Sequence, residues 1–160
     1  MLKSGEVDVA FCNFPIEDER LTLIPCAAIH DVFVYGEKYQ KMLDGVVSFD
    51  TLAHLPLIML ESKSNSRHYV ETFIQSFGTT IEPAFELGSH DLLLDFAQAN
   101  FGVACVTREF ADDLLERGSL REVTLEHPIP PRQIGLAYLK SVPLSPASER
   151  FVHIVQSNDI

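Results

Sequence analysis

Residues 56–78, PLIMLESKSNSRHYVETFIQSFG, decide the fold class. The apolar run Pro56–Leu60 has the length and composition of a buried strand. After the polar stretch ESKSNSR, apolar residues fall on one face of a helix and Gly78 suits the position after its last turn: Tyr69, Val70, Phe73, Ile74 and Phe77. A buried strand followed by an amphipathic helix is the building unit of α/β proteins.

The same succession recurs along the chain. Further strands are predicted at residues 6–12, 21–27, 31–37, 81–87 and 101–106, and further helices at 89–100, at 107–118 and from Ser145 onward. We therefore predict an α/β fold in which strands pair in parallel and helices cover both faces of the sheet.

Two connectors rich in proline or charge, residues 14–19 and 126–133, interrupt this pattern. They predict that residues 19–127 form one lobe. Residues 1–18 and the returning segment 128–160 would then meet in a second lobe.

Composition restricts the classes of function. The formal net charge of −11 disfavours contact with a phosphate backbone, so this chain alone should not hold DNA. No apolar run approaches the roughly 20 residues of a membrane helix, and the first residues lack the apolar stretch of a signal peptide. A cytoplasmic protein without membrane contact is expected.

Catalytic and metal-binding motifs are not found in the sequence. It has no nucleophile elbow, zinc-protease helix, phosphate loop or dinucleotide fingerprint, and its six histidines are scattered singly. Cys12, Cys26 and Cys105 are far apart and flanked by apolar residues, which favours buried thiols over a redox pair. We expect no enzyme, no metal and no cofactor.

Three segments resemble the effector-binding domain of LysR-type transcriptional regulators: LKSGEVDVAF at 2–11, FGVACVTREFADDLLERGSLREV at 101–123 and IGLAYLKSVPLSPASERFVHIV at 134–155. The resemblance runs through essentially the whole chain in the family's order. It implies a two-lobed domain like the type II periplasmic binding proteins, with a small effector in the cleft between the lobes. It also implies a homo-oligomer, a dimer or a tetramer.

The chain departs from the family in two respects. It has no helix-turn-helix, so DNA would be bound only through a domain absent from this chain. The segment at 2–11 also matches a point after the first strands of the family's first lobe. We therefore expect a fragment with residues 19–127 as the complete lobe and a partial lobe at 1–18 and 128–160.

The polar stretch between strand and helix is the main candidate site. Backbone N–H groups at a helix start attract anions, and hydroxyls, an amide and a guanidinium add to them. The resemblance places an effector-contacting loop here, so an anionic effector is predicted to bind Ser62, Ser64, Asn65, Ser66 and Arg67. The alternatives are a solvated loop with a helix cap and, for Arg67, an ion pair with Glu71.

Four further residues are candidates for the cleft. Asn13 follows a predicted strand, although it could equally form a turn before Pro15. Ser89 could donate a hydrogen bond to a ligand or only cap its helix. Phe101 and Gly102 could form a wall of the cleft or simply pack. A solute-binding protein of the same fold and an enzyme built on that fold are the rival functions.

Overall fold

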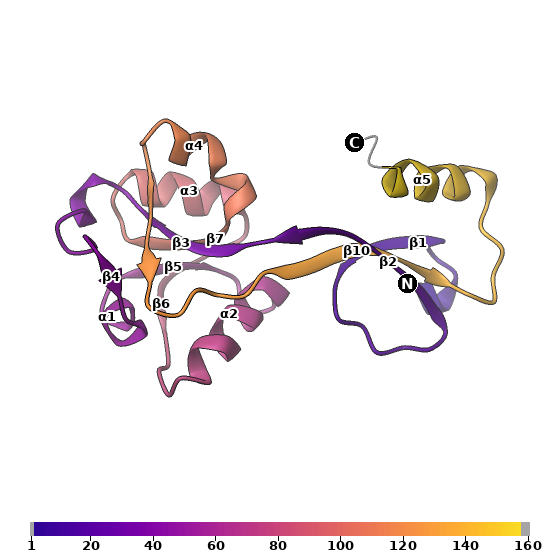
Figure 1. Cartoon of the computed structure of the whole chain (residues 1–160), viewed down its shortest axis with the longest axis horizontal. Coiled ribbons are helices and arrows are strands. Elements are labelled where there is room, and N and C mark those ends of the chain that lie inside the picture. Colours follow the sequence, from indigo (N-terminus) through magenta and orange to yellow (C-terminus); the bar gives the residue numbers. More distant parts are fainter. Residues whose placement is uncertain (1, 158–160) are drawn as a thin grey trace. The chain divides into compact units, whose positions relative to one another are not determined.

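The computed structural model describes residues 2–157, which divide into two compact units (Figure 1). Within the described residues, the first unit contains 2–29 and 132–157, and the second contains 30–131. No helix among the described residues has the length and apolar character needed to cross a membrane.

The first unit is a three-stranded antiparallel sheet with one helix packed on it. Its elements are η1 (Leu2–Ser4), β1 (Val9–Asn13), β2 (Leu21–Ile29), β10 (Arg132–Leu139) and α5 (Pro146–Gln156). The strand order is β1-β10-β2. Val152 and Val155 of α5 pack with Leu136 of β10. The predicted start of the last helix is confirmed, because Ser145 accepts a hydrogen bond from Ser148 N–H.

The second unit carries a five-stranded sheet in the order β6-β5-β7-β3-β8 and a separate parallel pair, β4 with β9. Its elements are β3 (Asp31–Tyr35), η2 (Glu37–Tyr39), β4 (Val46–Val47), α1 (Phe49–Ala53), β5 (Leu57–Leu60), α2 (Asn65–Gln75), β6 (Pro83–Leu87), α3 (His90–Gln98), β7 (Val103–Thr107), η3 (Arg108–Phe110), α4 (Asp112–Glu116), β8 (Arg121–Glu122) and β9 (Thr124–Leu125).

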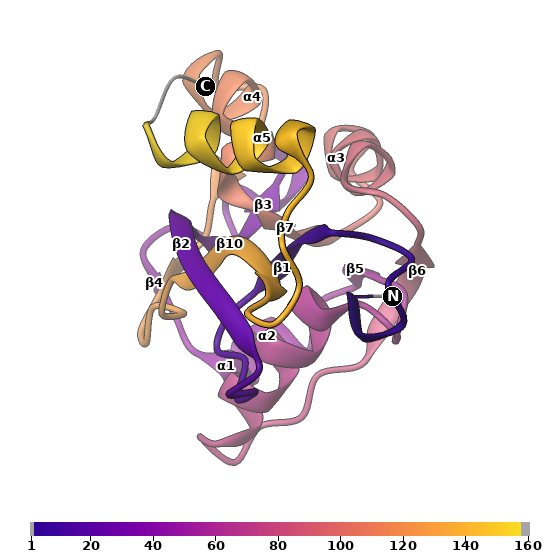
Figure 2. The same ribbon diagram turned by 90° about the vertical axis from the view of Figure 1, so that its right-hand side faces the viewer.

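Helices cover both faces of this sheet, as predicted. Alternate residues of a strand point to opposite faces, so Leu57 and Met59 join one core cluster with α2 whereas Ile58 joins another with α3. The two views agree in placing α2 and α3 on opposite sides of β5 and β7 (Figures 1 and 2).

Parallel pairing was only partly predicted correctly. β5 runs parallel to β6 and β7, which are joined through the crossover helices α2 and α3. β3, however, is antiparallel to β7, and every pair in the first unit is antiparallel. Two parallel strands that follow one another in the chain need a crossover connection. No such connection joins β3 to β7, because β4, β5 and β6 lie between them in the chain.

Two local predictions also need correction. Helix α2 begins at Asn65 with Ser64 as its cap, so it starts inside the polar stretch ESKSNSR rather than after it. The helix predicted from Thr107 is instead a 3-10 turn followed by α4, and Thr107 makes no capping hydrogen bond with its side chain. Thr107 is buried as the last residue of β7, opposite Asp31 of β3.

The compact units change over at 29/30 and 131/132, whereas the sequence places the lobe boundaries at 18/19 and 127/128. Residues 21–29 differ because β2 pairs with β10 along its whole length. The assignment of these units to a partial and a complete regulatory lobe stays a prediction.

Candidate functional site

One edge of the sheet in the second unit gathers several polar residues. β5, β6 and β7 run parallel in this sheet, so their carboxyl ends share that edge. The loops that follow lead into α2, α3 and η3. The antiparallel strand β3 begins at the same edge, with Asp31 opposite Thr107.

The predicted polar loop lies at this edge, and the structure divides it between the connection after β5 and the first turn of α2. Ser64 caps α2, because its Oγ accepts a hydrogen bond from Arg67 N–H. Ser62 and Asn65 are exposed. Ser66 is half-buried, and its hydroxyl donates to the Asp31 carboxylate at 2.8 Å. The loop therefore combines exposed polar groups with one hydroxyl that joins it to β3.

Arg67 contacts protein groups on three sides. Its Nε donates to Glu71 at 2.6 Å, and its Nη1 donates to the Leu60 carbonyl at 3.0 Å and lies 3.1 Å from Glu86. Burial alone would lower the pKa of Arg67, but the hydrogen bonds to Glu71 and Glu86 outweigh it and raise that pKa. The alternative considered from the sequence, an ion pair with Glu71, is the contact that the structure contains.

The remaining candidates are distributed over other parts of the molecule. Ser89 lies at the same edge as the loop and caps α3 by accepting from Leu92 N–H. Phe101 and Gly102 precede β7 and so lie at the opposite edge. Phe101 packs against Phe96, with ring centroids 5.1 Å apart.

Gly102 is required by packing. A Cβ at this position would lie 2.1 Å from the Pro56 carbonyl oxygen. Asn13 belongs to the first unit, where it ends β1 and its Oδ1 accepts a hydrogen bond from Arg132. Gly102 lies in the same unit as Ser64 but at the opposite edge of the sheet, and Asn13 belongs to the other unit.

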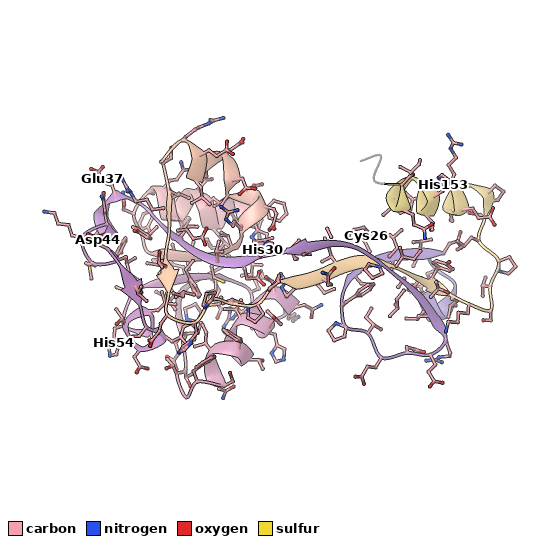
Figure 3. The ribbon with its side chains drawn as sticks, in the orientation of Figure 1. Cys26, His30, Glu37, Asp44, His54 and His153 are labelled. Carbon is pink, nitrogen blue, oxygen red and sulfur yellow. The ribbon has the colours of Figure 1, made fainter. Side chains whose placement is uncertain are left out.

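A cavity of about 470 Å³ lies in the second unit near Asp31, the partner of Ser66. Its lining includes four residues with titratable side chains that were not selected from the sequence: His30, Asp31, Arg108 and Glu122. His30 immediately precedes β3 (Figure 3). Two features of the sequence could have indicated this cavity: a charged residue, Asp31, begins the apolar strand DVFVY, and an arginine, Arg108, directly follows β7.

Ion pairs fix the polar end of this cavity. Arg108 Nε donates to Glu122 at 3.0 Å, and this hydrogen bond is the main cause of a raised Arg108 pKa. His30 Nδ1 lies 2.8 Å from Glu109. Burial alone would raise the pKa of Glu109, but the side-chain hydrogen bond with His30, two backbone hydrogen bonds and the charge of His30 together outweigh burial, and the pKa falls below its ordinary value.

Metal and thiol chemistry find no support among the described residues. Residues 2–157 contain no group of three or more His, Cys, Asp or Glu side chains placed to hold a metal ion. Cys105 is buried and Cys12 and Cys26 are half-buried, and these three form no disulfide. Burial, followed by the neighbouring Cys26, raises the pKa of Cys12, which disfavours its reactive thiolate.

Comparison with known proteins places this fold. Residues 1–159 match the family model of the LysR substrate binding domain. An uncharacterized HTH-type transcriptional regulator, YeiE of Escherichia coli K12, is 26% identical over 146 residues, or 91% of this chain and 50% of the relative. The chain thus spans about half the length of that relative.

Solved structures of low sequence identity have the same fold. The regulatory domain of Synechocystis PCC6803 CcmR, in complex with 2-PG, superposes with a TM-score of 0.84 at 17% identity, over 98% of this chain and 76% of that one. The effector binding domain of QuiR, in complex with shikimate, gives 0.80 at 17% identity, over 98% and 74%. The predicted α/β fold, of the type II periplasmic-binding-protein kind, is confirmed. This chain belongs to the LysR substrate-binding-domain family.

Proposed function

We propose that this chain is the ligand-sensing part of a LysR-type transcriptional regulator. The family match over residues 1–159 is the observation that carries the proposal, because this family serves transcriptional regulators and not enzymes. The two structural relatives named above were solved with small organic ligands. The chain would bind a small effector and leave DNA contact to a helix-turn-helix domain outside it.

The proposed effector contacts are the exposed and half-buried polar groups of the loop after β5 and of the first turn of α2. Ser62 and Asn65 are open to solvent, and Ser64 and Ser66 are half-buried beside them. The start of α2 supplies backbone N–H groups and a partial positive charge, which supports an anionic effector. Ser89 at the start of α3 is a further candidate on the same sheet edge.

Other predicted contacts are less well supported. The partners of Arg67 support a structural role for its guanidinium, and the Asn13 side chain bonds Arg132. The position of the effector between two lobes, the contribution of Phe101 and Gly102 to its wall, and the two lobes themselves stay predictions.

We further propose that the regulator is a cytoplasmic homo-oligomer. β6 is an edge strand of the sheet, and Phe85 of β6 packs with Phe96 and Phe101 into an aromatic cluster in which Phe101 is 53% exposed. An apolar face next to a strand edge supports association with a second copy. Effector binding would act by favouring one packing of the subunits over another.

The test is calorimetry of the 160-residue chain with a panel of small carboxylates and organic phosphates. We expect a member of the panel to bind, and Asn65→Ala to weaken it about tenfold by removing a hydrogen bond to a charged ligand. Asn65 is exposed, so the variant should fold normally. Ser119→Ala, another exposed polar truncation in the second unit, is the matched control and should leave affinity unchanged.

Two outcomes would contradict the proposal. If no member of the panel bound, an anion-sensing role would fail. If a ligand bound equally to wild type, Asn65→Ala and Ser66→Ala, the sensing role would stand but the loop would not be its site.

A further inference from the structure

Two side chains of helix α2 hold segments that are distant from it in the chain. The Ser66 hydroxyl donates to the Asp31 carboxylate at 2.8 Å, and the Tyr69 hydroxyl donates to the Pro130 carbonyl at 3.1 Å. Residues three apart are neighbours on the surface of a helix, so Ser66 and Tyr69 share one side of α2. Asp31 and Pro130 come from opposite ends of the stretch that forms the second unit.

Both partners adjoin the points where the chain passes from one unit to the other. The chain enters the second unit at His30 and leaves it at Pro131. Asp31 therefore follows the entry point directly, and Pro130 directly precedes the exit. One helix is thus hydrogen-bonded to both segments through which the chain joins the two units.

The exit segment, residues 126–131, is also packed onto the second unit beside α2. His127 stacks on Phe77, just after α2, with ring centroids 4.4 Å apart and an interplanar angle of 21°. Ile129 is 8% exposed and belongs to the same core cluster as Ile74 of α2. Half of this segment is proline, and each proline ring fixes a backbone dihedral. A displacement of α2 is therefore passed along this stiff segment rather than absorbed by bending.

The entry segment, residues 30–33, is held at its first residue. Arg108 N–H donates to the His30 carbonyl at 2.7 Å, and His30 N–H donates to the Glu109 carboxylate at 3.2 Å. The exchange of these amide protons with solvent reports whether the entry segment stays in place.

The start of α2 belongs to the proposed effector site, and Ser66 lies in its first turn beside the exposed Asn65. A hydroxyl has one donor hydrogen. A ligand that accepts this hydrogen from Ser66 therefore competes with Asp31 for it. Tyr69 follows any displacement of Ser66, because the two residues are less than one turn apart in a hydrogen-bonded helix.

We infer that α2 couples the proposed effector loop to both segments that join the two units, through the hydroxyls of Ser66 and Tyr69. The role of the ligand in this coupling rests on the proposed function. The two hydrogen bonds that carry it are present without a ligand. Ser66 is both a proposed effector contact and a link to the entry segment, whereas Tyr69 is a positioning residue.

Hydrogen exchange of the 160-residue chain, measured without any ligand, tests the coupling. Ser66→Ala and Tyr69→Phe each remove one hydroxyl. Ser66→Ala should speed exchange in the entry segment, and Tyr69→Phe in the exit segment, by about five- to tenfold. Because α2 joins the two segments, each variant should also speed exchange in the other segment, by about two- to fivefold.

Two further variants separate coupling from general loosening of the fold. Gln75→Ala is the matched control, because Gln75 is an exposed polar residue of α2. It should change exchange in either segment by less than about twofold. In the double variant of Ser66→Ala and Tyr69→Phe, the change should differ from the product of the two single changes by at least about twofold.

The inference is overturned if each variant changes exchange only in its own segment, if the two changes multiply in the double variant, or if Gln75→Ala loosens both segments equally. These outcomes would leave the effector proposal intact, because no ligand is present in the experiment. Failure of the calorimetric test would instead remove the proposed function and leave the exchange result as it stands.

Discussion

Replacing Arg67 with alanine should destabilise the protein because its guanidinium joins three elements. Only 9% of the side chain is exposed, and it contacts Glu71 on α2, the Leu60 carbonyl of β5 and Glu86 on β6. Removing one partner of a fully buried ion pair costs about 3–5 kcal/mol. Here Glu71 and Glu86 are 32% and 48% exposed, so water can solvate them after the change.

The expected loss is therefore smaller than for a fully buried pair. One net hydrogen bond to a charged group contributes about 1.5–3 kcal/mol, and the aliphatic part of the side chain adds some packing. We expect Arg67→Ala to lower the free energy of unfolding by about 2–3 kcal/mol. At about 2–4 °C for each kcal/mol, the melting temperature should fall by about 5–10 °C.

Urea denaturation followed by circular dichroism measures this loss. Arg117→Ala is the matched control, because Arg117 also faces an acid one turn away but is 73% exposed, with its nitrogen 3.9 Å from Asp113. Its effect should stay within about 0.5 kcal/mol. If Arg67→Ala were as stable as wild type but lost effector affinity, the guanidinium would be a ligand group and the reasoning from its protein contacts would be refuted.

Two further predictions concern a close contact and a carboxylate. Gly102→Ala should lower the free energy of unfolding by about 1–3 kcal/mol in the same assay, because the new Cβ would lie 2.1 Å from the Pro56 carbonyl oxygen. Gly88→Ala is the control and should be nearly neutral, because its Cβ would meet nothing nearer than 3.6 Å. Equal effects of the two substitutions would contradict a steric cause. The pKa of Glu109 lies below its ordinary value of 4.5, so the hydrogen bonds that favour its carboxylate, first among them the one with His30, stabilise the fold in full above pH 4.5. This stabilisation is lost as the pH falls through the lowered value. Stability should therefore fall less steeply with acidification in Glu109→Gln than in wild type, and identical pH profiles would exclude that contribution.

Much of the secondary structure could be predicted from residues near in sequence. Apolar periodicity placed α2 and α3, Ser89 makes the helix cap that was one of its two predicted roles, and the last helix begins after Ser145 as predicted. These features depend on contacts between residues one or two helical turns apart, so the residues that make them can be recognised from their spacing in the sequence. The predicted helix start at Thr107 was wrong because Thr107 is held in β7 opposite β3, a contact made across the sheet.

The candidate site was only partly predictable for the same reason. The polar loop before α2 was found from its composition and its position at a helix start, but the partner of Ser66 is Asp31, 35 residues away in the chain. The cavity was missed because its apolar wall and its polar end come from β3, from Arg108 and from residues 122–129. No local pattern joins these segments.

By itself, the sequence determined the alternation of strands and helices, the acidic surface and the family of the chain, because periodicity, charge and ordered motifs are properties of the chain alone. Only the tertiary structure decided that β3 runs antiparallel to β7, that Arg67 is engaged by Glu71 and Glu86, and that a cavity forms beside β3. These features depend on which distant segments pair and pack, and that choice is made by the free energy of the whole fold rather than by any local stretch.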